Sequence, residues 1–245
     1  MHKNKIVLND KTYSYIDVGI GKEILLIPGW CDQSDDFLTL IKPLSKKNRL
    51  LVPDLPNFGD SKTNELFEEE THTKFLSDFL KKLEINDPIV IGHCYGGKLA
   101  LQLSNQVSIP KIFLINSLGI KANFTWLEHV LLTLVNGVYE VTKDFALMSK
   151  VQSHWFKSML KYGGKKDFWN YANKIIYTEC ENLDKIKSKV TILWAKNDIM
   201  LSNSYAKKLK FKIKNSKLIF MKGSHFSCII NPNIFARKIQ SLMND

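Results

Sequence analysis

The segment from Ile89 to Leu101, IVIGHCYGGKLAL, limits what this chain can fold into more than any other stretch. An apolar β-type run enters a glycine-rich turn, and a run of good helix formers leaves it. The pattern G-x-C-x-G therefore predicts a strand, a sharp turn and a helix, with Cys94 exposed at the turn. A helix that starts there points its positive end at Cys94, which favours a thiolate. The motif alone leaves open an unreactive cysteine buried in a tight turn.

Length and composition restrict the class of protein. The chain has 245 residues, which fits one domain with or without an insertion, and 44% hydrophobic with 24% charged residues is typical of a soluble globular protein. No apolar run is long enough to span a bilayer, and the first ten residues are too polar for a signal peptide. The four cysteines are scattered without metal-binding spacing, so we expect reduced thiols and a cytoplasmic location.

The formal net charge of +11 invites a nucleic-acid interpretation. The lysines are spread along the chain, however, and no helix-turn-helix, RNA-binding or zinc signature accompanies them. An acidic protein partner or an acidic substrate carrier fits the charge equally well, and so does a lysine-rich composition with no partner at all. We therefore do not expect nucleic-acid binding.

Strand and helix patterns alternate over most of the chain. This alternation predicts an α/β fold with a mostly parallel, doubly wound sheet. The expected strands are 5–8, 12–18, 24–27, 50–53, 89–91, 111–116, 190–194 and 218–221. The expected helices are 35–44, 71–83 with Thr71 as N-cap, one from Tyr95, 202–209 and 233–243.

The alternation stops between about residues 119 and 184, where apolar residues occur at helical rather than strand spacing. We expect a helical insertion there that covers the carboxyl edge of the sheet as a lid. The predicted organisation is a core of residues 1–118 and 188–245 with a helical cap of residues 119–187.

A thiol nucleophile needs a base, and the base needs a group that orients it. Of the six histidines, His225 alone follows the last predicted strand and can reach the carboxyl edge; His72, for example, is expected at a surface helix start. Asp198 follows the preceding strand, whereas the strand that ends at Asn116 offers no carboxylate. The order Cys94, Asp198, His225 is the nucleophile–acid–histidine order of α/β hydrolases.

An oxyanion formed at Cys94 would need two backbone N–H groups. The residue after the nucleophile, Tyr95, supplies one in the expected geometry. The loop after strand 24–27 supplies the other: Gly29 allows close approach and Trp30 would donate, with its indole lining the pocket.

Five motifs over nearly the whole chain resemble the α/β-hydrolase fold superfamily with a helical cap. They are Pro28-Gly29-Trp30, Asp54-Leu55-Pro56-Asn57-Phe58-Gly59-Asp60-Ser61, the turn 92–97, Asn197-Asp198 and Gly223-Ser224-His225. Three positions depart from the family pattern: Pro28 replaces a histidine, Asn57 a glycine and Cys94 a serine.

The small size and the Pro28-Gly29-Trp30 loop are similar to carboxylesterases that demethylate pimeloyl-acyl-carrier-protein methyl ester in biotin synthesis. In those enzymes a tryptophan follows the oxyanion-loop glycine, and a basic cap meets the acidic carrier. Here Lys150, Lys157 and Lys161 in the cap share a helical spacing, and the resemblance implies that they contact such a carrier.

The resemblance implies a carboxylic-ester hydrolase that acts on a small-molecule or carrier-bound ester. Cys94 would form a thioester acyl-enzyme, His225 would transfer the proton and Asp198 would orient the imidazole, with Trp30 and Tyr95 as oxyanion donors. No metal or organic cofactor is expected. Two alternatives remain open: an acyltransferase or thioesterase on the same residues, and a ligand-binding protein that keeps the fold without catalysis.

Overall fold

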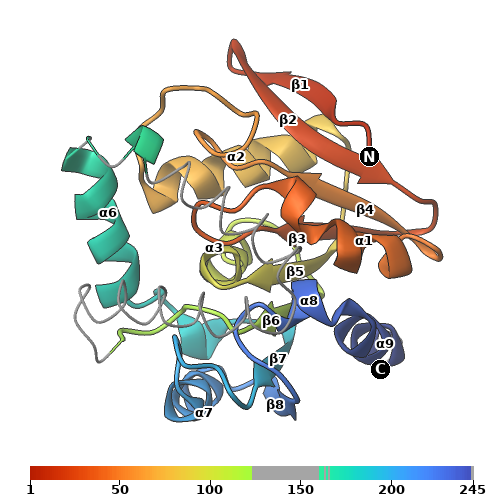
Figure 1. The fold of residues 1–245 in the computed structure, drawn as a ribbon, viewed down its shortest axis with the longest axis vertical. Coiled ribbons are helices and arrows are strands. Elements are labelled where there is room, and N and C mark those ends of the chain that lie inside the picture. The colour runs from red at the N-terminus through yellow and green to blue at the C-terminus, as the bar shows by residue number, and fades with distance from the viewer. Residues whose placement is uncertain (123–159, 163, 165, 244–245) are drawn as a thin grey trace.

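Strands and helices alternate around one sheet in the computed structural model, which describes residues 1–122, 160–162, 164 and 166–243 (Figure 1). The strands are β1 (Asn4–Leu8), β2 (Lys11–Val18), β3 (Lys22–Ile27), β4 (Asn48–Pro53), β5 (Ile89–His93), β6 (Lys111–Ile115), β7 (Lys189–Ala195) and β8 (Ser216–Met221). The helices are α1 (Leu38–Leu44), α2 (Glu69–Lys82), α3 (Tyr95–Leu103), α6 (Lys166–Tyr177), α7 (Asn203–Lys212), α8 (Ser227–Ile230) and α9 (Pro232–Leu242). Short 3-10 turns occupy Ser34–Phe37 and Leu183–Lys185.

The sheet follows the order β1-β2-β4-β3-β5-β6-β7-β8. β2 pairs antiparallel with both β1 and β4, and every later pairing is parallel. The central strand β5 lies between β3 and β6, with Ile24 opposite Ile89 and Val90 opposite Ile112. The predicted mostly parallel, doubly wound sheet is confirmed.

Helices cover both faces of the sheet, with α1 and α9 on one side and α2, α3 and α7 on the other (Figure 1). Successive side chains of a strand point to opposite faces, so the continuous apolar strands feed two cores. In β3, Leu25 and Ile27 join the core under α2, α3 and α7, whereas Ile24 and Leu26 join the core under α1 and α9.

Helix α2 begins earlier than its sequence pattern suggests. Its N-cap is Glu68, so the assignment of Thr71 as N-cap was wrong. His72, expected at the surface, is completely buried. It shares a helical spacing with the buried Phe75, Leu76 and Phe79, so it lies on the face that packs toward the core.

The segment 119–187 lies partly outside the described residues, so its division from the core as a cap stays a prediction. Its two ends meet. The N–H of Ala122 donates to the carbonyl of Ile176 at 3.0 Å, and that of Cys180 donates to the carbonyl of Gly119 at 2.8 Å.

The amino end of α3 crosses the carboxyl end of β3 at very short range. A Cβ on Gly96 would lie 2.1 Å from the carbonyl oxygen of Ile27 and 2.4 Å from that of Pro28. Both neighbours are backbone atoms within or next to the sheet, so they cannot turn aside. The glycine at position 96 is therefore a condition for placing α3 directly after Cys94.

Gly96→Ala should lower the free energy of unfolding by about 3 kcal/mol or more, because the methyl group must displace sheet backbone. Gly164→Ala is a matched control, since a Cβ there meets nothing within 4 Å; its effect should stay within about 0.5 kcal/mol. Urea denaturation of both variants measures the difference. Equal stabilities would contradict the close approach.

Candidate active site

The turn between β5 and α3 holds Cys94 in a strained conformation. Its φ and ψ are 50° and −116°, outside the regions that residues with side chains favour. Backbone hydrogen bonds hold it there: its N–H donates to Ile115 at 3.0 Å, and its carbonyl accepts from Gly97 at 3.1 Å and Leu118 at 3.0 Å. Cys94 is half-buried, whereas the other three cysteines are buried.

His225 and Asp198 meet at the same edge of the sheet, from the loops after β8 and β7. Nδ1 of His225 lies 2.8 Å from Oδ2 of Asp198, and both side chains are buried. The other carboxylate oxygen accepts the N–H groups of Met200 and Leu201, each at 2.8 Å. Because a carboxylate only accepts, Nδ1 of His225 carries the proton and Nε2 is left for the thiol.

The surroundings of His225 favour its charged form. Burial opposes the charge, but Asp198 and Cys94 outweigh it, through their charge and by accepting a side-chain hydrogen bond from His225. They raise the pKa of His225 well above its ordinary value. The structure thus brings together the three residues that the sequence predicts for a catalytic triad.

The loop after β3 lies directly against Cys94. The N–H of Gly29 donates to Oδ2 of Asp32 at 3.1 Å, and a Cβ on Gly29 would lie 2.6 Å from that oxygen and 3.4 Å from Cβ of Cys94. Within the described part of the chain, neither the N–H of Trp30 nor that of Tyr95 donates a hydrogen bond. An N–H group must be unpaired in this way if it is to serve as an oxyanion donor, which is the role predicted for both residues.

Two side chains hold the backbone of the loop that carries His225. Nδ2 of Asn116 donates to the carbonyls of His225 at 2.8 Å and Ser224 at 3.3 Å, while its Oδ1 accepts from Ala195 at 2.8 Å. Nε2 of His93 donates to the same His225 carbonyl at 3.2 Å. His93 thus supports the histidine loop instead of serving as a base.

Aromatic rings surround Trp30. Its ring centroid lies 5.0 Å from that of Phe58, 5.8 Å from Phe67, 5.2 Å from Phe168 and 5.4 Å from Tyr171. The indole itself is half-buried. This apolar wall also contacts Tyr95, whose ring centroid lies 5.6 Å from that of Trp30, and the pocket-lining role of Trp30 stays a prediction.

A buried chain of hydrogen bonds runs from Tyr95 and was not foreseen from the sequence. The hydroxyl of Tyr95 lies 2.7 Å from that of Tyr171 and 2.8 Å from Nδ1 of His72, whose Nε2 faces the carbonyl of Pro56 at 3.3 Å. Burial lowers the pKa of His72 to about 4, although the Pro56 carbonyl and Glu65 act in the opposite direction. Nothing local in the sequence pairs residue 171 with residue 95.

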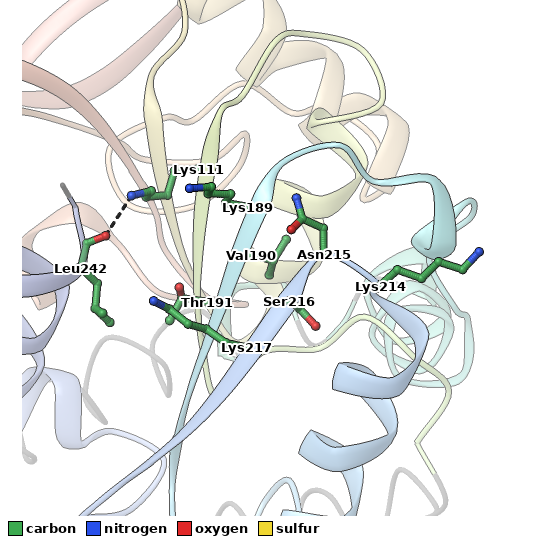
Figure 2. A pocket seen from close by; sticks show the side chains of 9 residues that line it. All are labelled: Lys111, Lys189, Val190, Thr191, Lys214, Asn215, Ser216, Lys217 and Leu242. Atoms are coloured by element: carbon green, nitrogen blue, oxygen red, sulfur yellow. Dashed lines mark hydrogen bonds between the residues drawn. The ribbon is translucent and has the colours of Figure 1, made fainter. Parts of the chain in front are cut away.

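A separate cavity of about 300 Å³ opens at the other end of the strands (Figure 2). Lysines 111 and 189 are the first residues of β6 and β7, and Lys214 and Lys217 flank the start of β8. The amine of Lys111 donates to the carbonyls of Leu242 and Met243 at 2.9 and 2.8 Å. This basic cavity lies at the amino edge of the sheet, opposite Cys94.

The three lysines predicted to meet a carrier protein are only partly described. Lys150 and Lys157 lie outside the described residues. The amine of Lys161 donates to the hydroxyl of Tyr162 and lies 4.4 Å from the centre of its ring.

In the described ranges no His, Cys, Asp and Glu side chains cluster as a metal site would require. Every helix in those ranges is too short or too polar to cross a bilayer.

Residues 22–147, more than half of the chain, match the model of the alpha/beta hydrolase fold family, and the chain belongs to that family. Membership of the α/β-hydrolase fold superfamily and the fold class, both predicted from the sequence, are confirmed by this match and by the sheet.

Among curated proteins, the chain is 32% identical over 99 residues to the magnesium-chelatase 30 kDa subunit of Rhodobacter capsulatus, covering 40% of this chain and 35% of that one. It is 24% identical over 116 residues to a soluble epoxide hydrolase of Corynebacterium sp., covering 46% and 41%. The matches thus span well under half the length of these relatives. The crystal structure of a membrane phospholipase A, a bacterial virulence factor, superposes with a TM-score of 0.83 at 18% identity, over 99% of this chain and 86% of that one.

Stability should fall in acid partly because of His72. The unfolded chain takes up the proton near pH 6.5 and the folded chain only near pH 4, so the folded state loses stability as pH falls between these values. The loss amounts to about 3 kcal/mol from pH 7 to pH 4. His72→Gln, which can still donate and accept, should remove this part of the decline in urea denaturation at pH 4, 5, 6 and 7. An unchanged pH profile would show that His72 takes up its proton equally in both states.

Proposed function

We propose that this protein is a carboxylic-ester hydrolase with Cys94, His225 and Asp198 as its catalytic triad. The observation that carries the proposal is the buried contact of His225 with Asp198 at 2.8 Å, with Cys94 at the strained turn beside it. Membership of the alpha/beta hydrolase fold family supports it.

In the proposed reaction the Cys94 thiolate attacks the acyl carbon, and the carbonyl π electrons move to the oxygen. The N–H groups of Trp30 and Tyr95 hold that oxyanion. As the tetrahedral intermediate collapses, the carbon–oxygen bond to the alcohol breaks and Nε2 of His225 protonates the leaving alkoxide, which leaves a thioester on Cys94. Water then attacks the thioester, His225 takes its proton, and the acid and the thiolate are released.

Asp198 keeps the proton of His225 on Nδ1 throughout both steps. Its second oxygen is already occupied by two backbone N–H groups, so the carboxylate cannot rotate away from the imidazole. The charge of Asp198 also stabilises the imidazolium that pairs with the thiolate.

We infer that the substrate is a carboxylic ester with an acyl chain that fits the aromatic wall around Trp30, and that an ester on an acidic carrier protein is one candidate. Net charge +11 supports attraction to an acidic carrier. A pimeloyl-carrier-protein methyl ester and a short-chain ester, compared side by side, test this choice. Acid released from the short ester alone would keep the esterase and reject the carrier substrate.

Intact-protein mass spectrometry during ester turnover should show a transient acyl adduct that is absent in Cys94→Ala. Iodoacetamide should label the protein once near neutral pH, at Cys94, because burial raises the pKa of the other thiols, that of Cys180 to about 12.

Cys180→Ala is the matched control, since it removes a buried cysteine away from the turn and should keep both adducts. A Cys94→Ala variant with full activity would reject the mechanism. If the wild type forms no acyl adduct and is not labelled, a ligand-binding protein becomes the better interpretation. If an adduct forms but reacts only with an added alcohol, amine or thiol, the protein is a transferase.

Asp198→Asn should reduce kcat about ten-thousandfold, because the amide favours the wrong imidazole tautomer. The exposed Asp184, changed to Asn, provides a control of the same chemistry and should leave kcat unchanged. Steady-state hydrolysis of the short ester measures both. Activity retained in Asp198→Asn would move the orienting role to another group.

A further inference from the structure

Helix α6 contacts the side chains of both proposed oxyanion donors. The ring of Trp30 packs against Phe168 and Tyr171 of this helix, with centroids 5.2 and 5.4 Å away. The hydroxyl of Tyr95 lies 2.7 Å from that of Tyr171. Tyr171 is therefore the residue of α6 that touches one donor through its ring and the other through its hydroxyl.

The direction of the hydrogen bonds is fixed by the chemistry of the chain. The Pro56 carbonyl only accepts, so Nε2 of His72 donates to it and the neutral Nδ1 accepts from Tyr95. The hydroxyl proton of Tyr95 is thereby used, and Tyr171 must donate to the Tyr95 oxygen. Tyr95 and His72 are completely buried and Tyr171 nearly so, so bulk water does not reach these groups.

A second anchor holds the far end of α6 to the nucleophile helix. The amine of Lys98, fully buried in α3, pairs with Glu69 at 2.6 Å and donates to Oγ1 of Thr178 at 2.6 Å. It also donates to the carbonyls of Ile175 and Thr178, both at 3.1 Å. This anchor contacts neither Trp30 nor Tyr95, so α6 can stay docked when the hydroxyl of Tyr171 is removed.

We propose that Tyr171 is a positioning residue that holds Trp30 and Tyr95 so that their N–H groups converge on the oxyanion. The proposal rests on the proposed function and adds to it a residue from outside the five sequence motifs. Without the Tyr171 hydroxyl, the Tyr95 oxygen loses its donor and the contact between α6 and Trp30 loosens. The charge on the oxygen in the transition state then meets donors that are less well aimed.

Tyr171→Phe should lower kcat for a short-chain ester about tenfold with little change in KM, a smaller loss than removal of an oxyanion donor causes. A trifluoromethyl ketone analogue of the ester adds to the thiol and forms an oxyanion, so its affinity should fall about tenfold as well. The rate of iodoacetamide labelling should not change, because it depends on Cys94 and His225 alone.

Thr178→Val is the matched control, because it removes a hydroxyl that anchors α6 without touching either donor. It should lower the free energy of unfolding and leave kcat and ketone affinity as in the wild type. Equal losses of kcat in Tyr171→Phe and Thr178→Val would show that Tyr171 is merely structural and would overturn the proposal, as would wild-type kinetics in Tyr171→Phe.

Failure of the proposed function gives a different result: the wild type itself would neither hydrolyse the ester nor bind the ketone, and both proposals would fall. If Tyr171→Phe does not fold, His72→Leu breaks the same chain at its other end. It should reduce kcat and ketone affinity together, and wild-type values in that variant would overturn the positioning role.

Discussion

The close approach of backbone segments around Cys94 is the constraint on which the rest of the site depends. A Cβ on Gly96 would fall 2.1 Å from the Ile27 carbonyl, and one on Gly92 would fall 2.5 Å from the Gly96 carbonyl. The end of β3, the end of β5 and the start of α3 thus approach one another so closely that no methyl group fits between them. Because none can shift alone, the turn that carries Cys94 is held in place against the end of β3. The charge stabilisation proposed for this site depends on such a preorganised turn.

Buried polar side chains extend this rigidity to the parts of the site that the sheet does not hold. Asn116 has partners in the loop after β8 and at the end of β7, namely the carbonyl of His225 and the N–H of Ala195. Each such bond adds only about 1 kcal/mol net, but a displaced loop would leave buried groups unpaired at a cost of about 1–3 kcal/mol each. The histidine loop is held less by the strength of its contacts than by the cost of breaking them.

The sequence was sufficient to predict the parts of the site that depend on local pattern and chain order. The strand–turn–helix at Cys94 is one continuous motif, and Asp198 and His225 follow predicted strands whose carboxyl ends share one edge. His72 was predicted at the surface because the expected helix began at residue 71, two residues later than α2 does. His72 therefore seemed to belong to the helix start, although it continues the helical spacing of Phe75 and Phe79. Tyr171 and Lys98 were not predictable, since Tyr171 pairs with Tyr95, 76 positions away, and Lys98 joins Glu69 to backbone carbonyls 77 and 80 positions away.

In the proposed mechanism, a cysteine at the turn changes which groups must stabilise the negative charge that forms during the reaction. Although burial opposes its charge, Asp198 and Cys94 raise the pKa of His225, so in the proposed mechanism the imidazolium is present before substrate binds. Attack moves the negative charge from the sulfur to the carbonyl oxygen. The imidazolium then lies farther from the negative charge than it did before the attack. The groups proposed to receive this charge are the N–H groups of Trp30 and Tyr95. In the proposed reaction their alignment limits the rate more directly than the basicity of the histidine, and the positioning role proposed for Tyr171 makes α6 a contributor to catalysis.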